Sequence, residues 1–349
     1  MGNKYIDNVK LTTVCKKILE EVEISSEHAE IISRTLVKAD LRGVHSHGVI
    51  RLPFYVQRLI DGGTKSNPDF KLTKETTTTA IFDADDGMGQ VATYFAMEKC
   101  IEKAKESGIS YIPIKKSGHF GAASLYAEQA LEHNMIGVAM SNVTNVMAPY
   151  GGCERKIGNN PLAAAIPTKS YDPILLDMSM SKVAGGKVRE AAKKGEEIPD
   201  DWIISKEGSK TTNPNKLEEG GALLPLGHKC VGLAVVIEAL TGGLAGSKLM
   251  SQIPLWFRET EEPTNVGHSV LAINIENFVD IDIFKERMDY VVKHLKSSKL
   301  AEGYEGIYAP GELEFSTERE SLQNGIPLNK SIINDLNKLT EKFSLDISI

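Results

Sequence analysis

Cysteines are few and long apolar segments are missing from this chain, and each shortage excludes a class of protein. The four cysteines, Cys15, Cys100, Cys153 and Cys230, stand far apart and form no C-x-x-C pair. This argues against a zinc ribbon or a disulfide framework and suits a reducing compartment. No segment approaches the roughly 18 consecutive apolar residues that span a bilayer, and charged residues interrupt the N-terminal segment where a signal peptide would need an apolar core. We therefore expect a cytoplasmic protein that does not enter a membrane.

A surplus of positive charge is also absent. Lysine and arginine number 40 against 47 acidic residues, which gives a formal net charge of −7. Because no basic stripe runs along the chain, nucleic acid and anionic membranes are not expected as partners. The 41% hydrophobic and 25% charged residues are typical of a globular protein, and the length of 349 residues suits about two domains.

The apolar pattern predicts an α/β (α+β) fold with helical segments at both ends of the chain. The first segments are helical over 8–22, then from Ser25 or Ser26 to Gly43, and then as far as Gly62. From about residue 75 strands and helices alternate, and a polar stretch over 196–221 reads as a surface loop. The predicted strands are 76–82, 109–114, 136–143, 162–166, 174–178 and 270–275, and the predicted helices are 90–106, 121–133, 182–194, 230–240, 282–296 and the tail from 330.

The densest group of reactive side chains lies in the segment Arg42–Arg51, just after a predicted helix. It holds His45, Ser46, His47 and Arg51 within a few residues of one another. Histidine titrates near neutral pH and can take up and return protons there, and the planar guanidinium of arginine matches a carboxylate. These residue types together indicate a site that holds a small acid and moves a proton. A solvated loop with a chance pair of histidines is the alternative.

A third histidine, His119, lies in Ser117–Gly121 between a predicted strand and a predicted helix. At a helix N-terminus the positive end of the dipole disfavours imidazolium and lowers the pKa of histidine. We therefore expect a neutral His119 that can accept a proton from an alcohol or return one to a carbonyl. The alternative is a linker histidine that is bonded only to backbone.

One glycine-rich sequence fits a dinucleotide motif but is rejected as one. Gly87–Ala92 matches G-x-G-x-x-A between a strand and a helix. However, Asp83, Asp85 and Asp86 stand directly before it and would repel a pyrophosphate at the helix N-terminus. The next strand, which ends near Ile114, supplies no acidic residue for a ribose. A tight surface turn is expected instead.

Weaker signals for ligand contact lie at three further places. Gly151-Gly152 and Gly158–Pro161 are rich in glycine and amide side chains, which allow close backbone approach and hydrogen bonding. Asp177–Lys182 joins a strand to a helix, where α/β sheets commonly bind ligands. Lys229 follows the start of a helix and could meet a phosphate there. Each of these signals taken alone is better explained by a turn or a helix cap.

Two other chemistries find little support. Ser46 lacks the G-x-S-x-G elbow of a nucleophilic serine. His45, His47 and His119 could share a metal ion, but no H-x-x-x-H spacing or carboxylate cluster accompanies them. No metal site is predicted.

Several of these motifs, taken in order, resemble the malate/L-lactate (L-sulfolactate, ureidoglycolate) dehydrogenase family of NAD(P)-dependent oxidoreductases. This family is unrelated to the Rossmann malate and lactate dehydrogenases. The resemblance is collinear from about residue 30 to 335. The segments that carry it are His45-Ser46-His47-Gly48 with Arg51, Gly118–Ala122, Pro149–Gly152, Gly158–Pro161, Asp177–Ser181, Leu224–Gly227 and Pro310–Glu312.

The resemblance implies a non-Rossmann NAD(P)-binding α/β domain with a mixed sheet over 76–311. It further implies a helical substrate and dimerisation domain formed by 1–75 together with 312–349, and a homodimer. His119 corresponds to a proposed catalytic base and His47 to a residue assigned as proton donor in some members, while Ser46 and Arg51 would contact the substrate. A further set of residues is implied to bind or border NAD or NADP: Asn160, Asp177, Met178, Ser179, Lys229, Gly311 and Glu312.

The chain departs from the family pattern in the cofactor region. Asn159 stands where the family usually has threonine, Asp177–Ser181 reads Asp-Met-Ser-Met-Ser instead of a D-M-A-T-S-like run, and Cys230-Val231 replaces a usual Gly-Tyr. These changes leave the choice between NAD and NADP open, but they do not touch the histidines.

The expected function is hydride transfer between nicotinamide and C2 of a small 2-hydroxy or 2-oxo acid of the malate, lactate, sulfolactate or ureidoglycolate type. A reductase of a cyclic 2-imino acid on the same scaffold is one alternative, since a hydride donor and an arginine clamp serve it equally well. A non-catalytic cofactor-binding protein is the other. The set of His47, Arg51 and His119 speaks against the second alternative, because a binding protein needs no proton acceptor.

Overall fold

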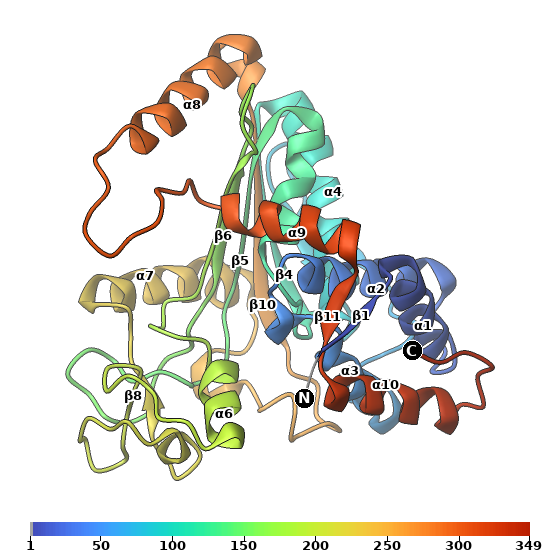
Figure 1. The fold of residues 1–349 in the computed structure, drawn as a ribbon. Coiled ribbons are helices and arrows are strands. Elements are labelled where there is room, and N and C mark those ends of the chain that lie inside the picture. Colours follow the sequence, from blue (N-terminus) through green and yellow to red (C-terminus); the bar gives the residue numbers. More distant parts are fainter. Residues whose placement is uncertain (1–2) are drawn as a thin grey trace.

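A seven-stranded sheet forms the centre of the computed structural model, which describes residues 3–349 (Figure 1). The strand order is β2-β3-β4-β10-β5-β6-β7, with β3 and β4 parallel and the other neighbours antiparallel. The predicted mixed, non-Rossmann sheet is therefore confirmed. The strands are β2 (Lys71–Thr73), β3 (Ile81–Asp83), β4 (Ile109–Ser117), β10 (Val266–Asn274), β5 (Met135–Ser141), β6 (Leu162–Ile166) and β7 (Ile174–Met178).

Ten α-helices surround this sheet within residues 3–349. They are α1 (Asn8–Glu20), α2 (Ser26–Leu41), α3 (Leu52–Asp61), α4 (Gly89–Ser107), α5 (Ser124–Ala127), α6 (Gly185–Lys194), α7 (His228–Glu238), α8 (Ile281–Lys296), α9 (Glu312–Asn324) and α10 (Lys330–Lys342). None of the helices in this part of the chain combines the length and the apolar character needed to cross a bilayer.

The helices near the N-terminus begin and end where the capping residues predict. The Ser25 hydroxyl accepts the N–H of His28 and starts α2. Gly43 follows the end of α2 with a φ of +74°, and Gly62 ends α3 with a φ of +84°. Glycine adopts this left-handed conformation without the strain that a Cβ would cause. The His-rich segment is therefore placed directly after a well-terminated helix.

The two ends of the chain build one structural unit, as Figure 1 shows at its lower right. Strand β1 (Lys4–Ile6) pairs antiparallel with β11 (Ile326–Leu328). Beneath this pair, side chains of α1, α2 and α3 pack against those of α10 in a single buried cluster, in which Leu11, Ile32 and Leu336 are at most 1% exposed. The helical unit built from both chain ends is therefore present, whereas the domain limits at 75/76 and 311/312 stay a prediction.

The two faces of the central sheet are covered by different helices. Helix α4 packs closely on β4 and β10, because the small side chains of Ala92 and Ala96 let it approach a layer that contains Ile112 and Val270. On the opposite face α7 packs through Ala234 against a second buried cluster. Helix α8 extends from the body of the molecule on this same side (Figure 1).

Several short or irregular elements differ from the sequence predictions. The strand expected at 76–82 is confined to β3, because the Thr76 hydroxyl accepts the N–H of Thr79 and closes a turn. The helix expected at 121–133 is a single α-turn, α5, followed by a 3-10 helix over Glu128–His133. The sequence reading missed α9 and the short strands β1, β2, β11, β8 (Ile203–Ile204) and β9 (Ala222–Leu223).

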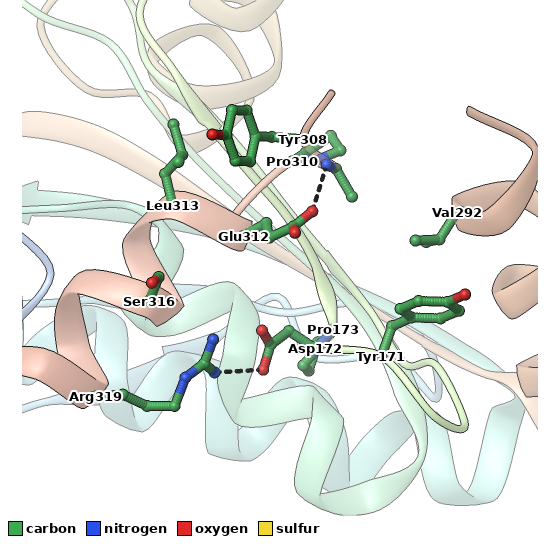
Figure 2. A pocket seen from close by; sticks show the side chains of 11 residues that line it. Tyr171, Asp172, Pro173, Val292, Tyr308, Pro310, Glu312, Leu313, Ser316 and Arg319 are labelled. Carbon is green, nitrogen blue, oxygen red and sulfur yellow. Dashed lines mark hydrogen bonds and ion pairs between the residues drawn. The ribbon is translucent and has the colours of Figure 1, made fainter. Parts of the chain in front are cut away.

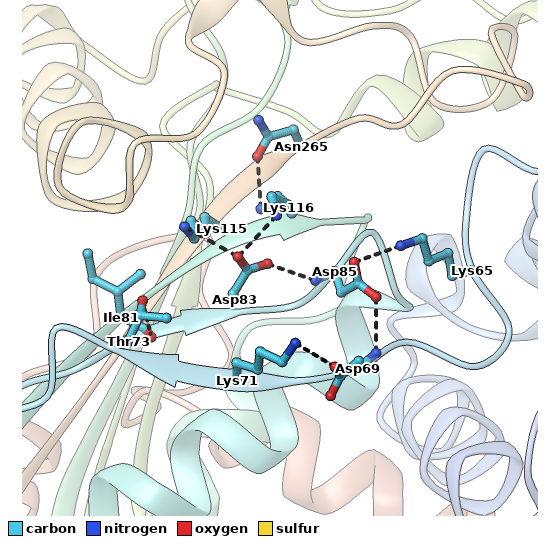
Figure 3. A network of polar contacts seen from close by, with 10 residues as sticks. All are labelled: Lys65, Asp69, Lys71, Thr73, Ile81, Asp83, Asp85, Lys115, Lys116 and Asn265. Carbon is cyan, nitrogen blue, oxygen red and sulfur yellow. Dashed lines mark hydrogen bonds and ion pairs between the residues drawn. The ribbon is translucent and has the colours of Figure 1, made fainter.

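The structure also changes the account of the glycines at the start of α4. Their acidic neighbours are neutralised: Asp83 pairs with Lys115 and Lys116, and Asp85 pairs with Lys65 (Figure 3). The turn is tight but buried, so the predicted surface position is wrong. A Cβ on Gly89 would lie 2.3 Å from the carbonyl oxygen of Gly118. Backbone therefore covers this helix N-terminus and leaves no room for a pyrophosphate.

Candidate active site

A buried carboxylate anchors the His-rich segment, which forms two short 3-10 helices, His45–His47 and Val49–Arg51. Asp40, in the last turn of α2, is 1% exposed. Its Oδ1 lies 2.7 Å from Nδ1 of His45, and its Oδ2 accepts the N–H of Val49 at 2.7 Å. A Cβ on Gly48 would lie 2.2 Å from this carboxyl group. Two hydrogen bonds to Asp40 therefore fix the backbone between His45 and Arg51, and the lack of a Cβ at Gly48 allows the close approach of the carboxyl group.

The two predicted histidines come together although they are far apart in the sequence. The rings of His47 and His119 lie nearly parallel, with centroids 5.8 Å apart and an interplanar angle of 11°. His119 also stacks on Trp256, with ring centroids 4.5 Å apart. Trp256 was not found by the sequence analysis, and the only available signal was that the chain has just two tryptophans.

A second residue that the sequence analysis missed holds the ring of His119. The hydroxyl of Tyr55, on α3, lies 2.7 Å from Nδ1 of His119, and the Gly121 N–H donates to the same nitrogen at 3.3 Å. Tyr55 itself is 2% exposed and stacks on Trp256. Because Nδ1 is occupied, Nε2 is the ring nitrogen left for a substrate. The spacing of Tyr55 and Arg51 on a helix start was the signal that could have found it.

Both histidines are held neutral at physiological pH. Burial, reinforced by the charge of Arg51, lowers the pKa of His47 to about 4. Burial, and after it the charge of Arg51, also holds the pKa of His119 well below its usual value. The predicted cause was wrong, because His119 does not start a helix: α5 begins only at Ser124 and spans four residues. Loss of solvent, and not a helix dipole, keeps the imidazole uncharged.

Arg51 brings an uncompensated positive charge to the same place. Its Nε donates to the carbonyl oxygen of Ser46 at 2.6 Å, and its guanidinium lies over the ring of Trp256 at 5.4 Å. Across residues 3–349 no carboxylate lies within ion-pair distance of this group. Ser46 contacts the other side of the cluster, where its hydroxyl lies 2.9 Å from Nδ1 of His47. A half-buried cation beside two neutral imidazoles is ready to bind an anion.

A second buried arginine holds Trp256 in position. Arg58, on α3, is 3% exposed. Its guanidinium donates to the carbonyl oxygens of Trp256, Glu259, Glu262 and Gly63 at 2.6–3.1 Å. The segment that carries the tryptophan is therefore fixed to the helix that carries Tyr55.

Two of the predicted cofactor residues, Asp177 and Asn160, are hydrogen-bonded within the protein. Asp177, on β7, accepts the N–H of Ser124 at 3.0 Å, just beyond the loop of His119. Asn160 is fully buried, and its amide nitrogen donates to Glu238 at 2.8 Å while its oxygen accepts the N–H of Val143 at 3.0 Å. All polar atoms of Asn160 are therefore engaged by the protein, so it shapes the glycine-rich loop.

Ser179 and Lys229 lie on the α7 side of the sheet. The Ser179 hydroxyl is 3.2 Å from that of Ser181, at the end of β7. Helix α7 begins at His228 with no side chain capping it and no acidic residue in its first turn. Lys229 in that turn is exposed and forms no ion pair with any residue of the described range 3–349. An uncapped N-terminus beside a free ammonium suits a phosphate group.

Gly311 and Glu312 lie elsewhere, at the start of α9. Gly311 has a φ of +88° and packs against Leu175. The Glu312 carboxylate accepts the Ala309 N–H at 2.9 Å and pairs with Lys296. Glu312 lines a cavity of about 280 Å³, which Figure 2 shows between α9 and the segment before β7. The lining includes Tyr171, Tyr308 and the ion pair of Arg319 with Asp172.

The structure therefore brings Ser46, His47, Arg51 and His119 into one cluster and leaves the predicted cofactor residues spread along β7 and at the starts of α7 and α9. Over residues 3–349 no group of three or more His, Cys, Asp or Glu side chains is arranged to hold a metal ion.

Comparison with known proteins decides the family. A family model described as malate/L-lactate dehydrogenase matches residues 6–337. The chain belongs to this malate/L-lactate dehydrogenase family. Its relatives include the malate dehydrogenase of Pyrococcus horikoshii, which is 37% identical over 345 residues that cover 97% of this chain and 95% of the relative. The family predicted from the sequence motifs is thereby confirmed.

Other members of the family differ in the cofactor that their names give. Ureidoglycolate dehydrogenase (NAD(+)) of Escherichia coli O157:H7 is 33% identical over 306 residues, which cover 87% of each chain. The (2R)-3-sulfolactate dehydrogenase (NADP(+)) of Chromohalobacter salexigens is 32% identical over 325 residues, which cover 93% of this chain and 94% of the relative. The predicted enzyme class, an NAD(P)-dependent dehydrogenase, is thus confirmed at the level of the malate/L-lactate dehydrogenase family.

Solved structures of the family superpose over nearly the whole chain. The structure of malate dehydrogenase from Pyrococcus horikoshii gives a TM-score of 0.91 at 35% identity and covers 99% of this chain and 100% of that one. The delta1-piperideine-2-carboxylate reductase from Pseudomonas syringae gives 0.86 at 25% identity, with 96% and 99% covered. The described fold is therefore that of the malate/L-lactate dehydrogenase family throughout.

Proposed function

We propose that this protein transfers a hydride between nicotinamide and C2 of a small 2-hydroxy or 2-oxo acid. The observation that carries the proposal is one cluster in which His119 and the unpaired guanidinium of Arg51 both contact Trp256, and the second neutral imidazole, His47, stacks on His119. Removal of hydride from an alcohol leaves a proton to be taken up, which a neutral histidine can accept. A carboxylate next to the reacting carbon gives Arg51 its ligand.

The residues along the sheet fit a dinucleotide. The uncapped start of α7 and the exposed Lys229 suit its phosphates, and Asp177, Met178 and Ser179 lie at the end of β7 between that helix and the His119 loop. We propose that these residues hold NAD or NADP, with Asn160 shaping the loop beside it and Gly311 and Glu312 bordering it. When bound, the nicotinamide supplies or accepts the hydride.

The protein groups divide the remaining work. Arg51 fixes the substrate carboxylate, and Ser46 hydrogen-bonds beside it. His119 takes the hydroxyl proton of the substrate at Nε2. To do so, the neutral ring must carry its proton on Nδ1 beforehand. In that tautomer Nδ1 donates to the Tyr55 oxygen, and the weaker hydrogen bond from the Gly121 N–H is lost. His47 is the second proton acceptor within the cluster. Trp256 excludes water from one face of the ring and holds it in position.

The experiment that tests this function is a panel of 2-oxo and 2-hydroxy acids, each with NAD(H) and NADP(H), followed by nicotinamide absorbance. We expect His119→Gln to lose about 10²–10⁴-fold in kcat while its affinity for NAD(P)H, measured by fluorescence quenching, is retained. Arg51→Gln is expected to raise KM for the acid more than it lowers kcat. Near wild-type turnover by His119→Gln with every accepted acid contradicts the assignment of the base.

A reductase of a cyclic 2-imino acid is the second candidate, and the similarity to a piperideine-2-carboxylate reductase supports it. The same guanidinium and proton donor serve a C=N bond beside a carboxylate. Activity with a cyclic imine and none with open-chain 2-oxo acids favours this candidate. Tight binding of NAD(P)H without turnover of any acid or imine favours a non-catalytic role instead.

We further propose that the protein acts as a cytoplasmic homodimer with domains over 1–75 with 312–349 and over 76–311. Support for the dimer comes from α8, where Ile283, Tyr290 and Leu295 are about half exposed or more while only Val292 is buried. Apolar surface of this kind normally meets a partner. Sedimentation analysis at micromolar concentration tests it, and a monomer at that concentration contradicts it.

A further inference from the structure

A second cation lies beside the site, on a helix that the sequence analysis did not connect with it. Helix α6 starts against the His-rich segment, because a Cβ on Gly186 would lie 3.6 Å from that of Ser46. One turn further along, the Arg189 guanidinium lies over the ring of Phe257 at 5.5 Å. Phe257 meets Trp256 edge-on at 5.8 Å, and Arg51 covers Trp256. Two guanidiniums therefore lie on adjacent aromatic rings.

The charge around Arg189 is not balanced. Glu218 is shared, because Oε1 accepts from Nε of Arg189 at 2.8 Å and Oε2 accepts from Arg258 at 2.9 Å. A third cation, Arg155, donates to the carbonyl oxygens of Leu217 and Gly221 close by. One carboxylate thus faces three guanidiniums. In residues 3–349 the Nε atom provides the only hydrogen bond of Arg189 to an acceptor, which leaves its terminal nitrogens for a ligand.

The two cations at the site influence each other. The pKa of Arg51 is lowered, first by burial and then by the nearby charge of Arg189, against the opposing effect of Tyr55. A ligand with a single negative charge would neutralise only one of these guanidiniums. A ligand with two acidic groups a few bonds apart would neutralise both, through a charge-assisted hydrogen bond to each guanidinium.

We propose that Arg189 binds a second acidic group of the substrate, so that the preferred substrate is a 2-hydroxy or 2-oxo acid with a carboxylate or sulfonate at its far end. This inference rests on the proposed function, because it assigns Arg51 to the carboxylate next to C2. Arg189 determines specificity and takes no part in the proton transfer. A substrate with an apolar or uncharged end is disfavoured, because it leaves the terminal nitrogens of Arg189 without an anionic ligand while Glu218 engages only Nε.

The test compares 2-oxo acids that differ by one acidic group. We measure kcat/KM for oxaloacetate, 3-sulfopyruvate and pyruvate at saturating reduced cofactor. For the wild type we expect oxaloacetate or 3-sulfopyruvate to exceed pyruvate by about 100-fold, and whichever is higher names the second group. In Arg189→Gln this ratio falls by about 10- to 100-fold, whereas Arg189→Lys keeps most of it.

Arg258→Gln is the matched control. Arg258 shares Glu218 and lies over Phe257 at 5.8 Å, yet it is largely exposed and has no contact with the histidine cluster. The Arg258→Gln variant is expected to keep the kcat/KM ratio of the preferred acid to pyruvate within about twofold of the wild type. The inference is overturned if Arg189→Gln loses kcat/KM equally for pyruvate and for the preferred acid with two acidic groups. It is also overturned if only the preference for NADPH over NADH changes. Wild-type turnover that favours pyruvate overturns it too and leaves the proposed function intact, whereas no turnover of any acid defeats the proposed function itself.

Discussion

Single contacts at ring nitrogens decide what the two histidines can do. Nδ1 of His47 faces the Ser46 hydroxyl, and Nδ1 of His119 faces the Tyr55 hydroxyl. A hydroxyl can donate or accept, so each ring can place its proton on either nitrogen as the reaction requires. The side chains that permit this exchange are therefore as important as the histidines themselves.

Removal of the Tyr55 hydroxyl tests this arrangement. We expect Tyr55→Phe to lower kcat for hydroxy-acid oxidation by about 10- to 100-fold, because Nδ1 of His119 loses the acceptor it needs when Nε2 takes a proton. KM for the acid should change little, which separates this effect from a loss of packing. Tyr111→Phe removes a hydroxyl that is bonded to the Leu240 carbonyl oxygen away from the site, and it should keep kcat. Equal kcat values for the two variants contradict the role of Tyr55.

Elements with strong local signals were predicted from the sequence, and weakly marked ones were not. Strands β6 and β7 and the ends of α2 and α3 follow directly from apolar runs, a capping serine and glycines. Helix α9 was missed because its apolar residues have no clear period, even though its acidic first turn is typical of a helix start. Strands of two or three residues carry too few side chains to show alternation.

The same limit applies to the site. His47, Arg51 and His119 stood out by residue type, and the spacing from Arg51 could have pointed to Tyr55. Trp256 and Arg189, in contrast, join them only through the packing of α6 and the segment after α7. No spacing in the sequence records that packing.

A substitution at Gly48 tests how far the two 3-10 helices, His45–His47 and Val49–Arg51, depend on the Asp40 carboxylate that holds them. We expect Gly48→Ala to displace the Asp40 carboxylate, because the new Cβ would lie 2.2 Å from it and a buried carboxylate has nowhere to move. Turnover should fall by at least about tenfold and stability by about 1–3 kcal/mol, measured by urea unfolding. Gly232→Ala, on the exposed side of α7 with no atom within 4 Å, should instead leave stability unchanged or raise it by about 0.5–1 kcal/mol. A stable and active Gly48→Ala variant contradicts the anchoring role.

At the scale of the whole molecule, a buried histidine makes folding sensitive to acid. His268, on β10, is fully buried between Ser141 and Ser117, and burial lowers its pKa to about 4. The unfolded chain binds a proton on this residue below about pH 6.5, whereas the folded chain does not until about pH 4. The contribution of His268 to stability is therefore complete above pH 6.5 and is lost as the pH drops towards 4, by up to about 1.4 kcal/mol per pH unit. His47 and His119, which are also buried and neutral, add to this slope.

Urea unfolding at a series of pH values from 7.5 to about 4.5 measures this slope. In His268→Gln the slope should decrease by up to about that amount, even though the variant is less stable at neutral pH. The exposed His294→Gln variant serves as the control and should keep the wild-type slope. An unchanged slope in His268→Gln shows that other groups cause the acid sensitivity.

The pairing of β1 with β11 has a consequence for biosynthesis. The strand that closes the helical unit around the His-rich segment leaves the ribosome long after the N-terminal helices that it covers. At translation rates of about 5–20 residues per second, the nascent N-terminal helices wait on the order of half a minute for their partner. During that interval their apolar faces are open to chaperones, and a polypeptide released early lacks the strand that completes the helical unit beside the His-rich segment.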